Sequence, residues 1–269
     1  MKTAPCLFLT ALSALLAESA AANPRPLPFS YPAESLPANG LEIEQIVDLT
    51  PVRTLDGTGA ERTIARTTLT TEFEFGLTRK LELGLYIQLA DDPVPGSEGA
   101  LRFDGLKQRL RWRVTEPESF PVDIALYGEV AELRNEIELE GKIIIQRYLG
   151  PVRLLTNLWL ERELYYSGRR EWVLHPTLGA AYELSPRLML GLEGWLLKEI
   201  ADRNDAPPGA DPYNNGPLVY LGPTVFAQGG EHAWLSLGAY TRLTDFGRSG
   251  QVGDRYGRFW VRLMLGIGL

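Results

Sequence analysis

The chain has 269 residues and a net charge of −7, and 45% of its residues are hydrophobic. Its mean hydropathy of −0.11 excludes a bundle of membrane helices. The acidic balance argues against a nucleic-acid partner, because such proteins present a basic stripe to the phosphates. The length allows one large domain or two small ones.

Residues 1–22 have the pattern of a secretory signal peptide. Lys2 precedes an apolar run over 6–17, and the alanines at 20–22 offer a cleavage site before Asn23. The apolar run is shorter than the roughly 20 residues that a membrane helix needs. Cys6, the single cysteine, lies in this segment, so the mature chain would have no disulfide and no thiolate metal site. We therefore expect an exported protein.

Residues 23–40 contain five prolines and are predicted to form an extended N-terminal tether or loop. From residue 41 to residue 269 the chain alternates apolar and polar residues with a period of two, which is typical of β-strands. The alternation predicts an all-β domain over 41–269 with about twelve antiparallel strands, ten to fourteen being possible. The predicted strands are 41–50, 66–78, 81–90, 106–115, 122–131, 136–149, 152–163, 172–184, 187–200, 217–228, 233–244 and 259–269.

The last strand has an apolar face without one polar member. Phe259, Val261, Leu263, Leu265, Ile267 and Leu269 share this face, whereas Arg262, Gly266 and Gly268 lie on the other face. We expect this strand to close an up-and-down barrel by pairing with 41–50, with the two glycines leaving room for inward side chains. Alternation alone also fits a soluble β-protein, so further observations are needed.

The connections between the predicted strands differ in length. Tight turns are expected at 78–80, 150–151, 185–186 and 229–230, and long joins at 51–63, 91–100, 201–216 and 245–257. Outer-membrane barrels show this asymmetry, because short turns face the periplasm and longer loops face outward. The alternation is imperfect, since the join at 134–135 is short where a long one is expected.

Strand length and aromatic positions also favour a membrane barrel. The predicted strands exceed the five or six residues common in soluble proteins and match the roughly 9 to 11 that a tilted membrane strand needs. Trp172 and Tyr182 share one apolar face at a separation that fits the two aromatic girdles of an apolar band about 25 Å tall. Trp112, on an apolar face, is a third candidate for a girdle.

Two segments resemble hairpins of a known class. FGLTRKLELGL (75–85) and YELSPRLMLGLEG (182–194) each join a strand, a tight turn with a basic residue and L-x-L-G-L. They resemble periplasmic hairpins of Gram-negative outer-membrane β-barrels, including the transporter-like barrels grouped with the MetA pathway of phenol degradation. The last strand resembles the signal read by the barrel-assembly machinery, although it ends on Leu269 and not on phenylalanine. The resemblance implies residence in the outer membrane and contact with its lipid and lipopolysaccharide, and it carries over no functional residue.

Charged residues on the polar faces would line the lumen of such a barrel. The candidates are a basic ladder of Lys107, Arg109, Arg111 and Arg113, flanked by Glu82, Asp123, Glu129, Glu136, Glu138 and Glu140. They could form a constriction that selects solutes by charge, or a salt-bridge network that fills a narrow barrel. The first reading predicts a passive channel or transporter for small solutes, and the second a structural barrel.

Other classes of function receive less support. An outer-membrane acyl hydrolase would need a serine and an acid beside His175, and the sequence places no serine close to it on that face. Asp202, Asp205 and Asp211 share a predicted loop, but their spacing does not match a calcium-binding loop. We therefore assign no catalytic residue, metal site or cofactor, and keep a lipid-modifying enzyme and a soluble periplasmic β-protein as alternatives.

Overall fold

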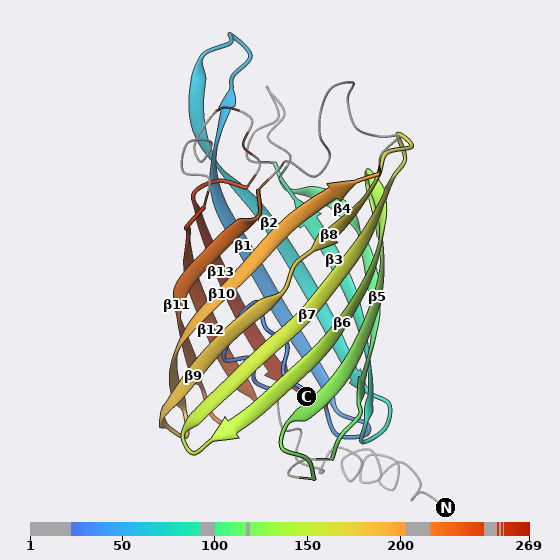
Figure 1. Ribbon diagram of the computed structural model, residues 1–269, viewed down its shortest axis with the longest axis vertical. Helices are drawn as coiled ribbons and strands as arrows, with labels where there is room; N and C mark the ends of the chain where they lie inside the picture. The colour runs from blue at the N-terminus through green and yellow to red at the C-terminus, as the bar shows by residue number, and fades with distance from the viewer. Residues whose placement is uncertain are drawn as a thin grey trace, which may run out of the picture.

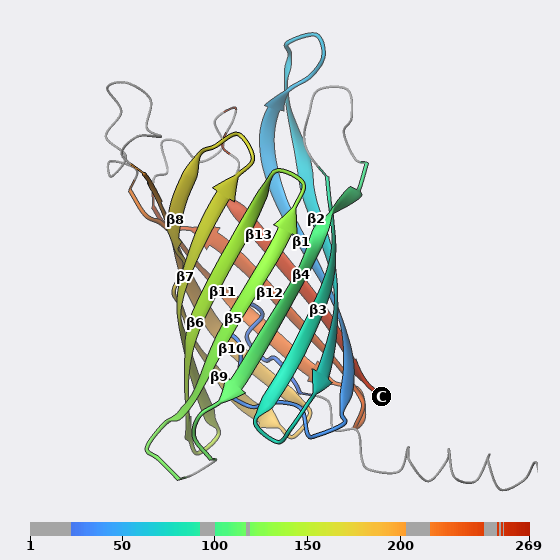
Figure 2. The same cartoon turned by 90° about the vertical axis from the view of Figure 1, so that its right-hand side faces the viewer.

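The computed structural model describes residues 23–91, 100–116, 119–202, 216–244, 252, 254 and 256–269. These residues form one closed antiparallel β-barrel (Figures 1 and 2). The predicted signal peptide, Asp205 and Asp211 lie outside them. No helix in this part of the chain is long and apolar enough to cross a membrane. The strands are β1 (Leu41–Leu55), β2 (Glu61–Gly76), β3 (Leu81–Ala90), β4 (Arg102–Arg113), β5 (Asp123–Leu133), β6 (Glu136–Leu149), β7 (Val152–Tyr165), β8 (Arg170–Leu174), β9 (Thr177–Ser185), β10 (Leu188–Ala201), β11 (Leu218–Gln228), β12 (Ala233–Arg242) and β13 (Phe259–Gly268).

The strands β8 and β9 are two halves of one barrel strand. Leu174 of β8 pairs with Leu160 and Lys198, and Thr177 of β9 continues the same registers with Asn157 and Trp195. Pro176 stands between the two halves, and its missing N–H interrupts the hydrogen-bond ladder without shifting it. The thirteen labelled strands therefore make a twelve-stranded barrel, as the alternation predicts.

The barrel closes where the sequence predicts, between its first and last strands. β1 pairs with β13 over eight residue pairs, from Glu42 with Gly268 to Leu49 with Val261. Closure leaves no free sheet edge along these strands. A Cβ on Gly266 would come within 2.2 Å of the Trp234 ring, so this glycine makes the room that an inward tryptophan needs.

The two ends of the barrel differ. The short connections after β2, β6, β9 and β11 lie at one end, together with Leu41 and Leu269, and this end is called the turn end. The opposite end is called the loop end. The prediction of a long join at 51–63 is wrong. The alternation continues through these residues, so β1 extends to Leu55 and β2 begins at Glu61. The two strands form a hairpin that rises above the loop end (Figure 1). The Asp56 carboxylate accepts hydrogen bonds from the amides of Thr58 and Ala60 and so closes its turn.

The outer surface of the barrel is an apolar belt. Leucine, isoleucine and valine side chains alternate outward on every strand, with Leu178 66% and Ile267 52% exposed. Large aromatic side chains lie at both borders of the belt. Phe103, Tyr166, Trp172 and Phe259 are exposed toward the loop end, and Trp112, Phe120 and Tyr182 toward the turn end. Such a belt between two aromatic girdles is the surface of a transmembrane barrel.

Candidate functional site: the barrel lumen

Residues 23–40, called here the inner loop, lie inside the barrel (Figures 1 and 2). The loop starts at the turn end, where the Asn23 amide donates to Glu42 Oε2 at 2.6 Å. It rises to Phe29 and Tyr31 and returns to the turn end, where the Asn39 amide donates to the Gly76 carbonyl at 2.8 Å. The five prolines suit this course, because a proline has no N–H to satisfy inside the lumen.

Side chains of the barrel wall bind the backbone of the inner loop. Asn157 accepts from the Tyr31 amide at 2.7 Å and donates to the Tyr31 carbonyl at 3.1 Å, as a neighbouring strand would. Further amides donate to wall side chains, namely Phe29 to Glu193, Ala33 to Gln146 and Leu36 to Glu82. The loop is therefore fixed by separate hydrogen bonds to side chains, and not by a continuous ladder that would make it part of the sheet.

The apex of the inner loop inserts one aromatic ring into the wall. The Phe29 ring lies 4.9 Å from Trp195, 5.1 Å from Tyr240 and 5.9 Å from Trp260, measured between ring centres. The Arg262 guanidinium covers the same ring at 3.7 Å. Burial of the ring and the cation–π contact both stabilise the inserted state.

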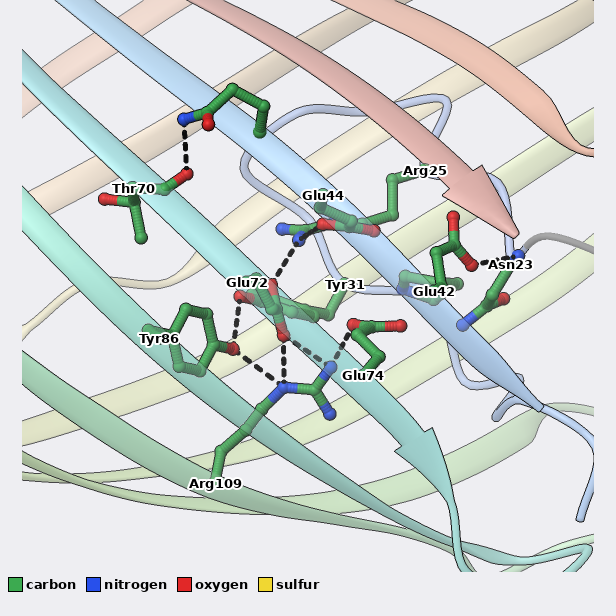
Figure 3. Close-up of polar contacts among 12 residues, drawn as sticks. Asn23, Arg25, Tyr31, Glu42, Glu44, Thr70, Glu72, Glu74, Tyr86 and Arg109 are labelled. Carbon is green, nitrogen blue, oxygen red and sulfur yellow. Dashed lines mark hydrogen bonds and ion pairs between the residues drawn. The ribbon is translucent and has the colours of Figure 1, made fainter. Parts of the chain in front are cut away.

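An ion network fills the lumen below the apex. Arg109 is fully buried, and its Nε donates to Glu72 Oε1 and to the Tyr86 hydroxyl, both at 2.7 Å (Figure 3). Its terminal nitrogens pair with Glu74 and Glu82. Arg25 of the inner loop pairs with Glu44 at 2.8 Å and lies 3.6 Å from Glu72. The network consists of Arg25, Arg109, Arg111, Glu42, Glu44, Glu72, Glu74 and Glu82, all of them buried.

Above the apex the lumen contains a cavity, which is called the vestibule. It is a cavity of about 110 Å³ whose floor includes Tyr31 of the inner loop. Asp48, Glu129, Glu140, Lys107, Lys142 and Arg262 contribute charged groups to its wall. The Lys142 ammonium lies 3.7 Å from the Trp159 ring centre and 4.1 Å from that of Tyr127. A space with this lining is suited to hold water and small polar solutes.

One side of the lumen toward the loop end is rich in glutamate. This side, the acidic wall, consists of Glu129, Glu136, Glu138, Glu140, Glu161, Glu163 and Glu171 on β5 to β8. Lys107 lies 3.2 Å from Glu138 and 3.5 Å from Glu129, and Lys142 pairs with Glu140. Arg169 pairs with Glu171. Among the residues that the structure describes, the seven carboxylates outnumber these three cations, so the acidic wall favours positive charge.

The sequence-predicted lumen residues separate into three groups. Arg109, Arg111 and Glu82 belong to the ion network, and Lys107, Glu129, Glu136, Glu138 and Glu140 lie at the acidic wall. Arg113 and Asp123 lie at the turn end, where Arg113 donates to the Arg79 carbonyl at 3.0 Å. The basic ladder is therefore not one surface, because its members meet different partners at different depths.

The candidates for chemistry lie in environments that do not resemble catalytic or calcium sites. His175 stacks on Trp159 at 4.1 Å, and its Nε2, like the buried Ser236 Oγ, has no hydrogen-bond partner among the described residues. The two therefore do not form the hydrogen-bonded pair that a hydrolase needs. The Asp202 carboxylate accepts hydrogen bonds from both terminal nitrogens of Arg162, at 2.9 and 2.6 Å.

Comparison with solved structures places the barrel in a known fold. No family model and no curated protein matches the chain. An outer membrane channel from Pseudomonas putida F1 superposes with a TM-score of 0.61 and 11% identity, over 88% of this chain and 98% of that chain. The chain has the fold of outer-membrane channels. The NanC porin gives a TM-score of 0.53 and 8% identity, over 84% and 98%. With this fold and its apolar belt, the barrel is a transmembrane one.

The sequence reasoning missed the inner loop as part of the site. Nothing in its proline pattern distinguishes a segment inside a barrel from one in solvent. A signal was present in β1 and β2, where Glu42, Glu44, Glu72 and Glu74 all point inward and need cations from other elements at the same depth. Arg25 supplies one of them from the inner loop. A second signal is Asn157, a buried amide on an otherwise apolar stretch.

Proposed function

We propose that this protein is a passive channel of the outer membrane for small polar solutes, and that the inner loop closes it. The turn end then faces the periplasm and the loop end faces outward, as the loop lengths of outer-membrane barrels require. Likeness in fold to an outer membrane channel and a porin supports this proposal. No covalent step and no cofactor is needed.

The proposal rests on one observation: the inner loop, which blocks the lumen, is not a strand of the barrel wall. The inner loop occupies the lumen between the vestibule and the periplasm, and its contacts with the wall are hydrogen bonds, ion pairs and the packing of Phe29. Each hydrogen bond contributes only about 0.5–1.5 kcal/mol net, so the loop can leave while the ladder of the barrel stays intact. A filled structural barrel would have no need of a removable filling.

The residues of the vestibule predict which charge passes. The acidic wall carries more carboxylates than cations, whereas Arg109 and Arg111 lie below the apex, each paired with Glu82. The two arginines are thus neutralised and do not make the channel anion-selective. We expect a channel with a preference for cationic over anionic solutes.

Liposome swelling tests the proposal directly. Vesicles that contain the full chain should admit small solutes slowly, and vesicles with a chain lacking residues 24–36 should admit them fast, with cationic solutes ahead of anionic ones of equal size. Heat-dependent migration on gels shows that the shortened chain still forms a barrel. A folded, shortened barrel that admits no solute would contradict the channel and favour a structural role.

Loss of Arg25 from the ion network could destabilise the shortened chain, so a second variant keeps the loop. Phe29→Ala removes the ring from its aromatic pocket and leaves every backbone hydrogen bond of the loop possible. This variant should admit solutes at a rate between those of the full and shortened chains. A rate equal to that of the full chain would show that the inner loop does not act as a closure.

A further inference from the structure

A groove crosses the apolar outer face of the barrel. It has a volume of about 970 Å³ and spans β5 to β10, with Leu126, Ile143, Leu158, Leu174 and Leu196 among its lining residues. Glycines at outward positions explain its depth. Gly128 pairs with Gly141 across β5 and β6, and Gly141 pairs with Leu160 of β7, so two side chains are missing side by side in the belt.

The groove descends from the loop end to the middle of the barrel. One registered row of outward residues runs from Lys198 through Leu174, Leu160 and Gly141 to Gly128. Lys198 lies near the loop end of β10, which ends at Ala201, whereas Gly128 lies near the middle of β5. Figure 1 shows the tilt that makes this row slope downward from β10 to β5. Four strand spacings of ~4.8 Å give a row about 19 Å long, which at a strand tilt of ~40° descends about 12 Å, most of one hydrocarbon leaflet of about 15 Å.

Basic side chains gather at the upper end of this groove. Arg162 lines it and lies 4.9 Å above the Trp172 ring, in the girdle of the loop end. Arg170 and Lys198 occupy outward positions next to it, because they pair with Leu164 and Leu174. Arg162 also pairs with Asp202 at 2.6 Å. Charges on the lipid-facing surface are tolerated near the interface and not at the midplane, so these residues mark the level of the lipid head groups.

We infer that this groove is a binding site for one phosphorylated glycolipid of the outer leaflet. One acyl chain would lie along the glycine row, and a phosphate would meet Arg162, Arg170 and Lys198. Arginine matches phosphate oxygens with two parallel donors, and basic pockets beside an apolar surface are typical lipid head-group sites. The level of the basic cluster commits the site to the outer leaflet. The inference rests on the membrane orientation in the proposed function, and not on the channel activity.

Native mass spectrometry of the full-length barrel tests the inference, with lipid A and dephosphorylated lipid A offered in equal amounts. We expect the barrel to retain one lipid A and to prefer it at least tenfold over the dephosphorylated form. The double variant Arg162→Ala with Lys198→Ala should lose this preference. The control Arg53→Ala should keep it, because Arg53 pairs with Glu61 on the β1–β2 hairpin, away from the groove.

A second variant tests the groove without changing any charge. A Cβ at Gly128 meets no atom within 4 Å, and one at Gly141 meets only the Tyr127 carbonyl oxygen at 4.0 Å. Gly128→Leu with Gly141→Leu should therefore fill the groove without strain and displace the lipid. Equal retention of both lipids, or retention unchanged by the leucines, would overturn the inference. Failure to enter vesicles at all would instead refute the membrane placement on which the proposed function also rests.

Discussion

The two halves of the lumen are built by opposite means. In the half toward the turn end, side chains from β1 to β4 and the inner loop pair every arginine of the ion network with glutamate and leave it buried. In the half toward the loop end, the acidic wall lies beside the cavity of about 110 Å³, with fewer cations than carboxylates among the described residues. The difference shows that one strand pattern can specify both a filled and a hollow stretch of lumen, according to the positions of the cations.

The largest effect is expected from breaking the filled half. Arg109→Ala removes the common partner of Glu72, Glu74 and Glu82 and leaves buried carboxylates uncompensated. The free energy of unfolding should fall by about 3–5 kcal/mol, which urea titration of the barrel in detergent would measure. Arg113→Ala, at the rim with a half-exposed Glu116 as partner, should cost less than about 1 kcal/mol. Equal losses would mean that depth in the lumen does not matter.

The next effect concerns the junction between the two halves. Asn157→Ala removes both hydrogen bonds to Tyr31 and leaves a buried amide and carbonyl of the loop without these partners. Release of the inner loop should become easier by about 1–3 kcal/mol, so the Tyr31 amide should exchange its hydrogen about 5- to 150-fold faster. Thr156→Ala changes the neighbouring outward residue and should leave that exchange unchanged. Protection that survives Asn157→Ala would show that packing alone holds the loop.

A smaller effect is expected in the open half. Glu138→Gln with Glu161→Gln, made in the chain lacking residues 24–36, removes two of the seven carboxylates of the acidic wall. The reversal potential in a salt gradient should move toward zero and keep its sign, because five carboxylates remain. Glu183→Gln, at an exposed residue near the turn end of β9, serves as the control. An unchanged reversal potential in the double variant would remove the acidic wall from the account of selectivity.

The smallest effect is a loosening of the inner loop in acid. Burial alone would raise the pKa of Glu34, but the charge of Arg153 and hydrogen bonds from Tyr148 and Gln146 lower it below its ordinary value of 4.5. A lowered pKa means that the contact stabilises the loop above pH 4.5 and is lost as the pH falls through the lowered value. Solute entry should therefore be constant from pH 7 to 5 and rise below pH 4.5.

Glu34→Gln provides the matched control for this pH dependence, because the amide cannot lose a charge. Its entry rate at pH 7 should be raised, and the step below pH 4.5 should be smaller than in the unchanged chain. The same swelling assay measures both. A step of equal size in the variant would assign the acid response to another group.

Much of the barrel was predictable from the sequence, and the site was predictable only in part. The alternation of apolar and polar residues determines which side chains point inward, as it does for Glu129 and Arg109. The same alternation along the chain predicts the strands and the pairing of β1 with β13. The depth of a residue along the lumen decides its partners, and that depends on the tilt and registers of twelve strands together. The position of the inner loop could not be predicted from the alternation, because its contacts with Asn157 and Glu193 join residues more than 120 positions apart.

Single-channel recording in planar bilayers tests most directly whether the inner loop closes a cation-preferring passage. The full chain should be silent or open briefly, and the chain lacking residues 24–36 should conduct steadily, with a reversal potential of the sign that cation preference requires. Two results would contradict the account. One is steady conductance of the full chain equal to that of the shortened chain, and the other is a sealed bilayer when the shortened barrel is inserted and folded.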